Sequence, residues 1–210
     1  MSVQDVSFEQ MLGYSHDEDG NVLGVGREDS RDAARTTEEL LYSAQQGNPS
    51  DQLILGAMYY SGVGVQKDFV AAAVWLRRAA ESGNADAQYF LGKMYEFREG
   101  LLDDCGGAAY WYRLGAEQGS AICQYELGLI YYYGNGVLRD HVVAAEWFRH
   151  AADGGSPEGI YCLGWMYHCG EGVLQDHSRA FSYYNRAAGL GDLDAQFELA
   201  GMYKRGEGVT

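Results

Sequence analysis

Along most of the chain, apolar side chains recur at the three- and four-residue spacing that places them on one face of an α-helix. After Asn84, a favourable N-cap residue, the apolar positions are Ala87, Leu91, Met94 and Tyr95. In two other segments the residue after the cap position is proline, which is tolerated in the first turn of a helix. This pattern predicts a helix that begins after Asn84 and ends at the next glycine-containing turn, where positive φ costs little.

A second helical pattern follows each such turn. Asp68 is an N-cap residue, and Gly83 stands where a helix ends in the left-handed conformation. The apolar face between them consists of Ala72, Trp75, Leu76, Ala79 and Ala80. Two helices joined by a short turn of this kind form an antiparallel pair.

Both patterns repeat every 36 residues, which indicates a repeat array. The columns that carry the period are Gly56, Gly92, Gly128 and Gly164; Leu55, Leu91, Leu127, Leu163 and Leu199; Tyr59, Tyr95, Tyr131, Tyr167 and Tyr203; and Trp75, Trp111 and Trp147. The glycines of the first column lie inside a helix, where glycine is unfavourable. We therefore expect them to allow close approach of the neighbouring helix, with alanines such as Ala72 and Ala79 opposite.

The segment from Leu55 to Gly83, with its Leu-Gly-Ala-Met-Tyr-Tyr-Ser-Gly-Val-Gly-Val start and its Trp75 and Ala79-Ala80, resembles the Sel1-like repeat. The resemblance covers residues 32–210. It implies an all-α fold, a right-handed α/α superhelix (solenoid) of 36-residue helix pairs related to tetratricopeptide arrays. The expected divisions are an N-terminal acidic arm (1–31), a degenerate half repeat (32–47), four repeats (48–83, 84–119, 120–155, 156–191) and a final partial repeat (192–210).

Two places depart from the pattern. Arg98 replaces a turn glycine, so we expect a remodelled turn there. Asp104 stands at the cap position of the next helix, but Gly106 and Gly107 weaken its start. In the half repeat, Thr36 and Glu39 are spaced as a capping box.

The formal net charge is −15, from 15 basic and 30 acidic residues. Phosphate-binding surfaces need clustered lysine and arginine, so the charge argues against nucleic acid as a partner and against an anionic membrane surface. Residues 1–30 alone carry seven acids and one base, and they include a short apolar pattern from Val3 to Leu12 that suits a helix. Gly20, Gly24 and Gly26 argue against regular structure after that pattern.

The residues with chemical potential do not form a recognisable site in the sequence. Cys162 and Cys169 lie about 10 Å apart along one predicted helix, too far for a disulfide. The set Cys162, His168, Cys169 and His177 matches no compact zinc-ligand spacing. No carboxylate is grouped with a nucleophile or base. We therefore predict reduced thiols, no catalytic residue, no metal and no cofactor.

Some positions on the first helix of each repeat vary between repeats, although the packed columns stay constant. In arrays that this chain resembles, first helices line a concave groove, and exposed aromatic residues in a groove are typical interface anchors. The predicted protein-binding residues are Tyr60, Phe90, Lys93, Glu96, Glu126, Leu129, Tyr132, Trp165, His168 and Lys204.

The sequence thus favours a non-catalytic adaptor or scaffold that binds a protein partner with a basic or mixed surface. Two alternatives stay open: an immunity protein that neutralises a secreted bacterial toxin, and a hydrolase. No signal peptide and no stretch of about 18 apolar residues is present, which favours a cytoplasmic protein without membrane insertion. Leu199, Met202 and Tyr203 lack a following second helix in the sequence, which suggests end-to-end contact there.

Overall fold

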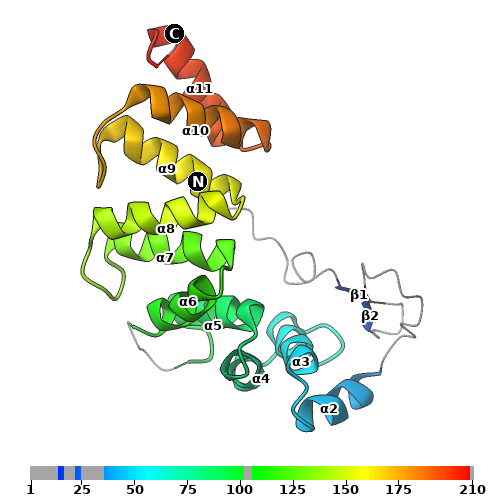
Figure 1. Ribbon diagram of the computed structural model, residues 1–210. Coiled ribbons are helices and arrows are strands. Elements are labelled where there is room, and N and C mark those ends of the chain that lie inside the picture. Colours follow the sequence, from blue (N-terminus) through cyan, green and yellow to red (C-terminus); the bar gives the residue numbers. More distant parts are fainter. Residues whose placement is uncertain (1–13, 17–21, 25–35, 102–105, 209–210) are drawn as a thin grey trace. The chain divides into compact units, whose positions relative to one another are not determined.

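The computed structural model describes residues 14–16, 22–24, 36–101 and 106–208. The chain divides into two compact units, Met1–Asp103 (unit 1) and Asp104–Thr210 (unit 2). The helices of each unit follow one another in chain order, and each packs on the next (Figure 1).

Unit 1 contains two short strands before its helices. Strand β1 (Tyr14–His16) pairs with β2 (Val22–Gly24) in an antiparallel ladder. The expectation that the glycines exclude regular structure in this part of the arm was therefore wrong. The helix expected between Val3 and Leu12 lies outside the described residues.

The helices of unit 1 are α2 (Thr37–Gln45), α3 (Pro49–Ser61), α4 (Phe69–Glu81) and α5 (Ala85–Phe97). Thr36 and Glu39 form the predicted capping box on α2. Asn48, Asp68 and Asn84 cap the three following helices with their side chains.

Unit 2 contains α6 (Gly107–Glu117), α7 (Ala121–Tyr133), α8 (His141–Asp153), α9 (Pro157–Cys169), α10 (His177–Gly189) and α11 (Leu193–Arg205). The N-cap residues Asp140, Ser156, Asp176 and Asp192 accept hydrogen bonds from the first turns of α8 to α11. The first helices α7 and α9 of consecutive repeats also touch each other.

The in-helix glycines mark close crossings, as the sequence predicts, but the residues opposite are not the alanines. A Cβ atom added at Gly128 would lie 2.6 Å from Cδ1 of Phe148, and one at Gly56 would lie 2.6 Å from Cγ of Leu76. Leu76 and Phe148 are among the most deeply buried side chains. The absent side chain of glycine thus makes room for the largest core residue of the second helix.

Side-chain hydrogen bonds connect consecutive repeats inside each unit. Gln52, Gln88 and Gln124 donate from Nε2 to the carbonyls of Ala44, Ala80 and Ala116, at 3.0–3.1 Å. Position 160 holds isoleucine instead, and there Arg186 donates to the corresponding carbonyl, that of Ala152, at 2.7 Å. Each of these bonds adds a second donor to a carbonyl at the end of a second helix, where the N–H of the following glycine (Gly47, Gly83, Gly119 or Gly155) already donates.

The tyrosine column is connected in a similar way. Arg77 and Arg113 donate to the hydroxyls of Tyr95 and Tyr131, at 2.9 and 2.6 Å. Burial raises the pKa of Tyr167, but hydrogen bonds from Arg179 and Arg149 outweigh it and lower the pKa overall.

The two departures from the repeat pattern, at Arg98 and at the start of α6, both lie in residues 84–119, which we call the irregular repeat. They have different outcomes in the structure. Arg98 does not remodel the start of its turn, because it adopts φ 58° and ψ 37° and its N–H still bonds to the carbonyl of Met94. Gly62, at the same place one repeat earlier, has φ 81°. Asp104 is not the N-cap of α6: that helix begins after Gly106 and has no side-chain cap.

The described part of the chain thus forms ten helices arranged as an α-helical repeat solenoid, which confirms the predicted all-α fold apart from β1 and β2. Three described cysteines, Cys123, Cys162 and Cys169, carry free thiols, and Cys105 lies outside the described residues. Within the described ranges, each helix is too short or too polar to cross a membrane.

Candidate functional site

A pocket of about 260 Å³ lies in unit 2, over the last turns of α7 and the middle of α9. Its lining is mainly aromatic. The residues are Leu129, Tyr132, Tyr133, Phe148, Tyr161, Cys162, Trp165 and Met166. Phe148 comes from α8, and the others come from the two first helices.

The 36-residue period explains how two helices build one pocket. Leu129 and Trp165 occupy the same position in consecutive repeats. Tyr132 follows Leu129 by three residues and therefore lies on the same face of α7. Because α7 and α9 touch, these faces are neighbours, and the side chains between them enclose the pocket.

The polar groups of the pocket are uncharged at neutral pH. Burial and a 2.7 Å hydrogen bond to Glu171 raise the pKa of Tyr132 to about 12. Burial also raises the pKa of Tyr161 to about 12 and that of the Cys162 thiol to about 12. Cys162 is therefore a poor nucleophile, since the thiolate is the reactive form. The pocket can accept an apolar group and offer neutral hydroxyls to it.

Trp165 is the most exposed of the predicted anchors in this pocket, with 37% of its surface accessible. Its ring stacks on His168, with the centroids 6.3 Å apart. A large, half-exposed aromatic side chain at the edge of a preformed pocket is the usual geometry of a binding anchor.

The structure brings three of the ten predicted protein-binding residues into the pocket: Leu129, Tyr132 and Trp165. His168 stands beside them, half-buried. Lys204 lies exposed on α11 and does not line the pocket.

The predicted residues of unit 1 make local contacts and do not line the pocket of unit 2. Tyr60 packs edge-on against Phe69, with the ring centroids 5.2 Å apart. Lys93 pairs with Glu96 at 3.2 Å. These side chains are occupied by local contacts.

Two predicted residues are too buried to contact a partner directly: Phe90 is 6% exposed and Glu126 is 7% exposed. The reason is visible one repeat earlier, where Ile54 at the same position belongs to a buried cluster with Leu40 and Ala44 of the preceding helix. This position faces the neighbouring repeat, so Phe90 and Glu126 are structural residues.

Tyr133, Tyr161 and Met166 line the pocket but were not predicted from the sequence. For Tyr161 a signal was available, because Tyr89, Tyr125, Tyr161 and Phe197 form a further aromatic column at the 36-residue period. The position of Glu207 beside His168 and His177 was not predicted either, since the three residues come from three different helix ends.

Comparison with known proteins identifies relatives of the whole array. The family model of the Sel1 repeat matches residues 49–84, 85–120, 121–156, 157–192 and 193–210, one residue later than the predicted boundaries. No curated protein sequence matches the chain.

Two solved structures are similar in sequence and fold. One is a protective antigen present in uropathogenic Escherichia coli strains and displaying an SLR fold; it is 39% identical with a TM-score of 0.80. The alignment covers 82% of this chain but only 37% of that protein. The other is a Sel1 repeat protein from Oxalobacter formigenes, 34% identical with a TM-score of 0.75, where the alignment covers 83% of this chain and 67% of the other.

Proposed function

Since the chain belongs to the Sel1 repeat family, whose members are generally protein-interaction modules, we propose that it binds a protein partner through the pocket between α7 and α9. The observation that carries this proposal is the position of Trp165. It combines a half-exposed indole with a preformed cavity, and the backbone around it is fixed in two packed helices.

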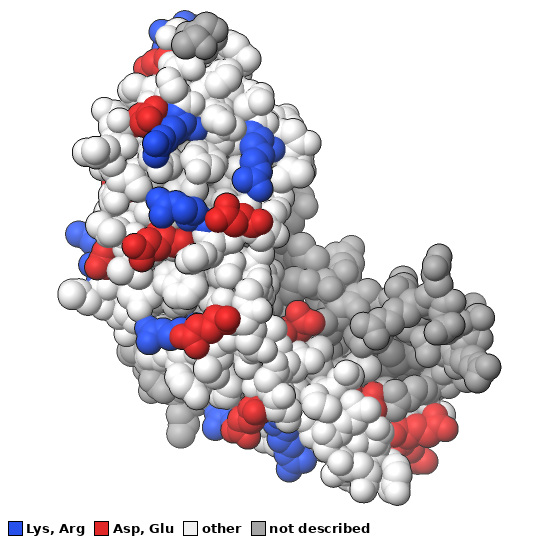
Figure 2. All heavy atoms as spheres, viewed as in Figure 1, with Lys and Arg blue, Asp and Glu red and all other residues white. Residues whose placement is uncertain are grey.

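The partner segment that suits this pocket carries an apolar side chain flanked by basic or polar residues. The cavity walls are aromatic and neutral, so a buried charge would be costly there. Around the pocket the chain is acidic overall: residues 104–210 contain 13 acids and 7 bases. Acidic and basic side chains lie next to one another on the face shown in Figure 2. Electrostatic attraction would therefore be modest, and the apolar anchor would supply most of the affinity.

The test is affinity capture with the full chain as bait, followed by mass spectrometry and a binding titration with the retained protein. We expect Trp165→Ala to weaken binding at least tenfold, because truncation of a central aromatic anchor commonly costs that much. The matched control is Tyr110→Ala, which removes an aromatic ring that is 57% exposed on α6 and does not line the pocket.

The proposal fails if Trp165→Ala binds as tightly as the unmodified chain, or if Tyr110→Ala weakens binding equally. The identity of the captured protein also distinguishes an adaptor partner from a neutralised toxin. The family is built on a generally non-catalytic scaffold, and the raised pKa of Cys162 agrees with binding rather than nucleophilic catalysis.

A second copy of the chain is a further proposed partner, at helix α11. Leu193, Phe197 and Tyr203 are 76%, 77% and 57% exposed there. Met202 is fully buried, so the expectation that it lacks cover was wrong. If copies associate through this face, light scattering should show a dimer that Phe197→Ser returns to monomer; a chain that is monomeric at all concentrations contradicts this contact.

A further inference from the structure

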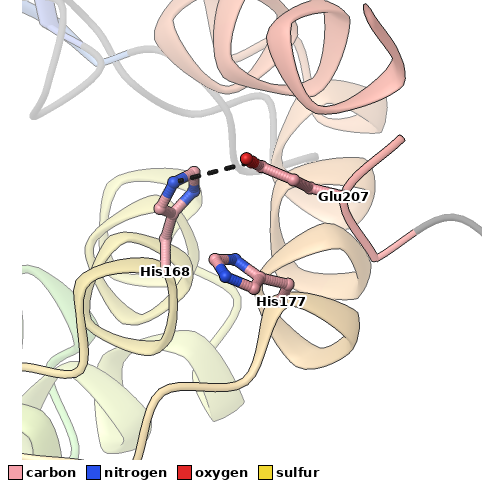
Figure 3. A group of neighbouring side chains, drawn as sticks. All are labelled: His168, His177 and Glu207. Atoms are coloured by element: carbon pink, nitrogen blue, oxygen red, sulfur yellow. Dashed lines mark ion pairs between the residues drawn. The ribbon is translucent and has the colours of Figure 1, made fainter. Parts of the chain in front are cut away.

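Three potential metal ligands meet at the ends of three helices in unit 2 (Figure 3). His168 lies in the last turn of α9, His177 is the first residue of α10, and Glu207 follows the end of α11. One ring nitrogen from each histidine and one carboxylate oxygen all lie within 4.8 Å of one another. We call these three residues the histidine–glutamate cluster.

The polar atoms of this cluster are not satisfied by one another. Nε2 of His168 and Oε2 of Glu207 are 4.0 Å apart, which is longer than a hydrogen bond. The Nδ1 atoms of both histidines are buried without a hydrogen-bond partner. Buried polar atoms normally have partners, so these histidines have ring nitrogens available for a ligand.

The preceding repeat shows the same arrangement in a satisfied form. Its equivalent residues, 36 positions earlier, are Tyr132, His141 and Glu171. The hydroxyl of Tyr132 donates to Glu171 at 2.7 Å, and its ring stacks on His141 with the centroids 4.9 Å apart. In the cluster, His168 replaces this tyrosine and makes no such bond. Both repeats thus have a glutamate at this position. The residue that donates a hydrogen bond to it in the first, Tyr132, is replaced in the second by His168, a potential metal ligand.

The backbone fixes the carboxylate beside the histidines. Gly208 has φ 67°, and a Cβ atom there would lie 2.2 Å from the carbonyl oxygen of His177. Only glycine can pack so closely, so the turn that carries Glu207 is docked directly on the first residue of α10. Gly172 packs in the same way on His141, with 2.1 Å for the corresponding contact. The position of Glu207 therefore follows from the repeat geometry and not from a flexible tail.

From this geometry we propose that His168, His177 and Glu207 bind a divalent first-row transition metal ion, with zinc as its representative. Two imidazole nitrogens and one carboxylate oxygen are a donor set that zinc accepts, and a fourth coordination position stays open. At metal–ligand distances of about 2.1 Å, tetrahedral ligands are roughly 3.4 Å apart. The ligand atoms lie within 4.8 Å of one another, so binding of one ion requires side-chain rotations that shorten these separations by at most about 1.4 Å.

Some charges around the cluster favour a bound cation, and others oppose it. The C-terminal ends of α9 and α11 point carbonyl groups toward this region and favour a cation. The N-terminus of α10 and the 2.9 Å ion pair between Arg205 and Glu207 oppose it. Binding of the metal therefore competes with Arg205 for the carboxylate, and Arg205→Ala should tighten it.

The direct test is calorimetric titration of the untagged full chain with zinc chloride under reducing conditions. We expect one zinc ion per chain at this cluster, and at least a tenfold loss of affinity in each of His168→Gln, His177→Gln and Glu207→Gln. The matched controls are His141→Gln, in the satisfied arrangement of the preceding repeat, and Cys169→Ser, whose exposed thiol adjoins His168. Neither control should change the affinity.

A loss of zinc affinity could also result from a damaged fold, so a second variant is designed to gain a zinc site. Tyr132→His would place a second imidazole beside His141 and Glu171 and so reproduce the donor set of the histidine–glutamate cluster. The titration should then show a second zinc ion per chain. The proposal is overturned if the unmodified chain takes up no zinc at millimolar concentration, if the three glutamine variants keep the affinity, or if Cys169→Ser abolishes it. It does not depend on the proposed protein partner, because zinc alone is the probe.

Discussion

Arg98 adopts the backbone conformation that glycine adopts at the same place in other repeats. It is the one non-glycine residue with positive φ among those the structure describes. Residues with a Cβ atom pay a conformational cost in this region, whereas glycine does not. The repeat geometry therefore overrides the local preference of arginine, and the turn begins in the usual way.

Replacing Arg98 tests this cost. We expect Arg98→Gly to be more stable than Arg98→Ala by about 1 kcal/mol, because both variants lose the side chain but only alanine keeps the Cβ strain. Urea denaturation of the two variants measures the difference. Gly189, at the end of α10 with open space around it and no positive φ, provides the opposite case: Gly189→Ala should be neutral or stabilising. Equal stabilities at position 98 would show that no strain is stored there.

The sequence predicted part of the pocket lining but not the histidine–glutamate cluster. Trp165 and Tyr132, which do line the pocket, were selected because the residue type at their positions varies between repeats. Glu207 was missed because it is 39 residues from His168, and only the docking of Gly208 on His177 brings it close. Phe90 and Glu126 were misassigned, since variation between repeats does not distinguish an exposed position from one that faces a variable neighbour.

At the scale of the helix pair, a glycine opposite a large core residue sets the distance between the two helices. Gly128 faces Phe148, and Gly164 faces Tyr184, whose Cδ1 would lie 3.0 Å from an added Cβ. The sequence predicted a close crossing here, since glycine inside a helix needs compensation. It could not show which residue of the second helix fills the space, because Leu76, Phe148 and Tyr184 vary in size.

A methyl group at this crossing should push the helices apart. We expect Gly128→Ala to destabilise the chain by about 1–3 kcal/mol, the usual cost of overpacking, although alanine is the better helix former. Thermal and urea denaturation measure the effect. If Phe148 is the obstacle, Phe148→Leu should recover part of the stability in the double variant; a purely additive result would place the strain elsewhere.

At the scale of the whole molecule, a solenoid is stabilised by each repeat and by its contacts with neighbouring repeats. The glutamine-to-carbonyl bonds are part of the second contribution. They lie at the same place between repeats in unit 1 and in unit 2. The helix pattern, the period and most of the caps were legible in the sequence, because they depend on local spacing, but the cap expected at Asp104 was not found on α6. The division into two compact units was not predicted; it falls next to α6, which lacks a side-chain cap.

The junction at Ala152 can be tested by exchanging one donor for another. Arg186→Ala should destabilise the chain by about 1 kcal/mol, the usual net contribution of one hydrogen bond, because the Ala152 carbonyl then keeps only the N–H of Gly155 as a donor. Adding Ile160→Gln should restore much of that loss, since glutamine at the equivalent positions supplies the same bond. Hydrogen exchange in α8 and α9 reports where the loss is felt. No recovery in the double variant would mean that the arginine acts through packing and not through this bond.

The acceptor at each of these junctions belongs to the main chain, so no substitution can remove it. Only the donor can change, and it can come from either helix of the following repeat, as Gln124 and Arg186 show. A repeat can therefore lose its glutamine without breaking the array, provided that another long polar side chain reaches the same oxygen. Mutational tolerance at these junctions then depends on which side chains can reach the carbonyl, and agreement with a consensus sequence would underestimate it.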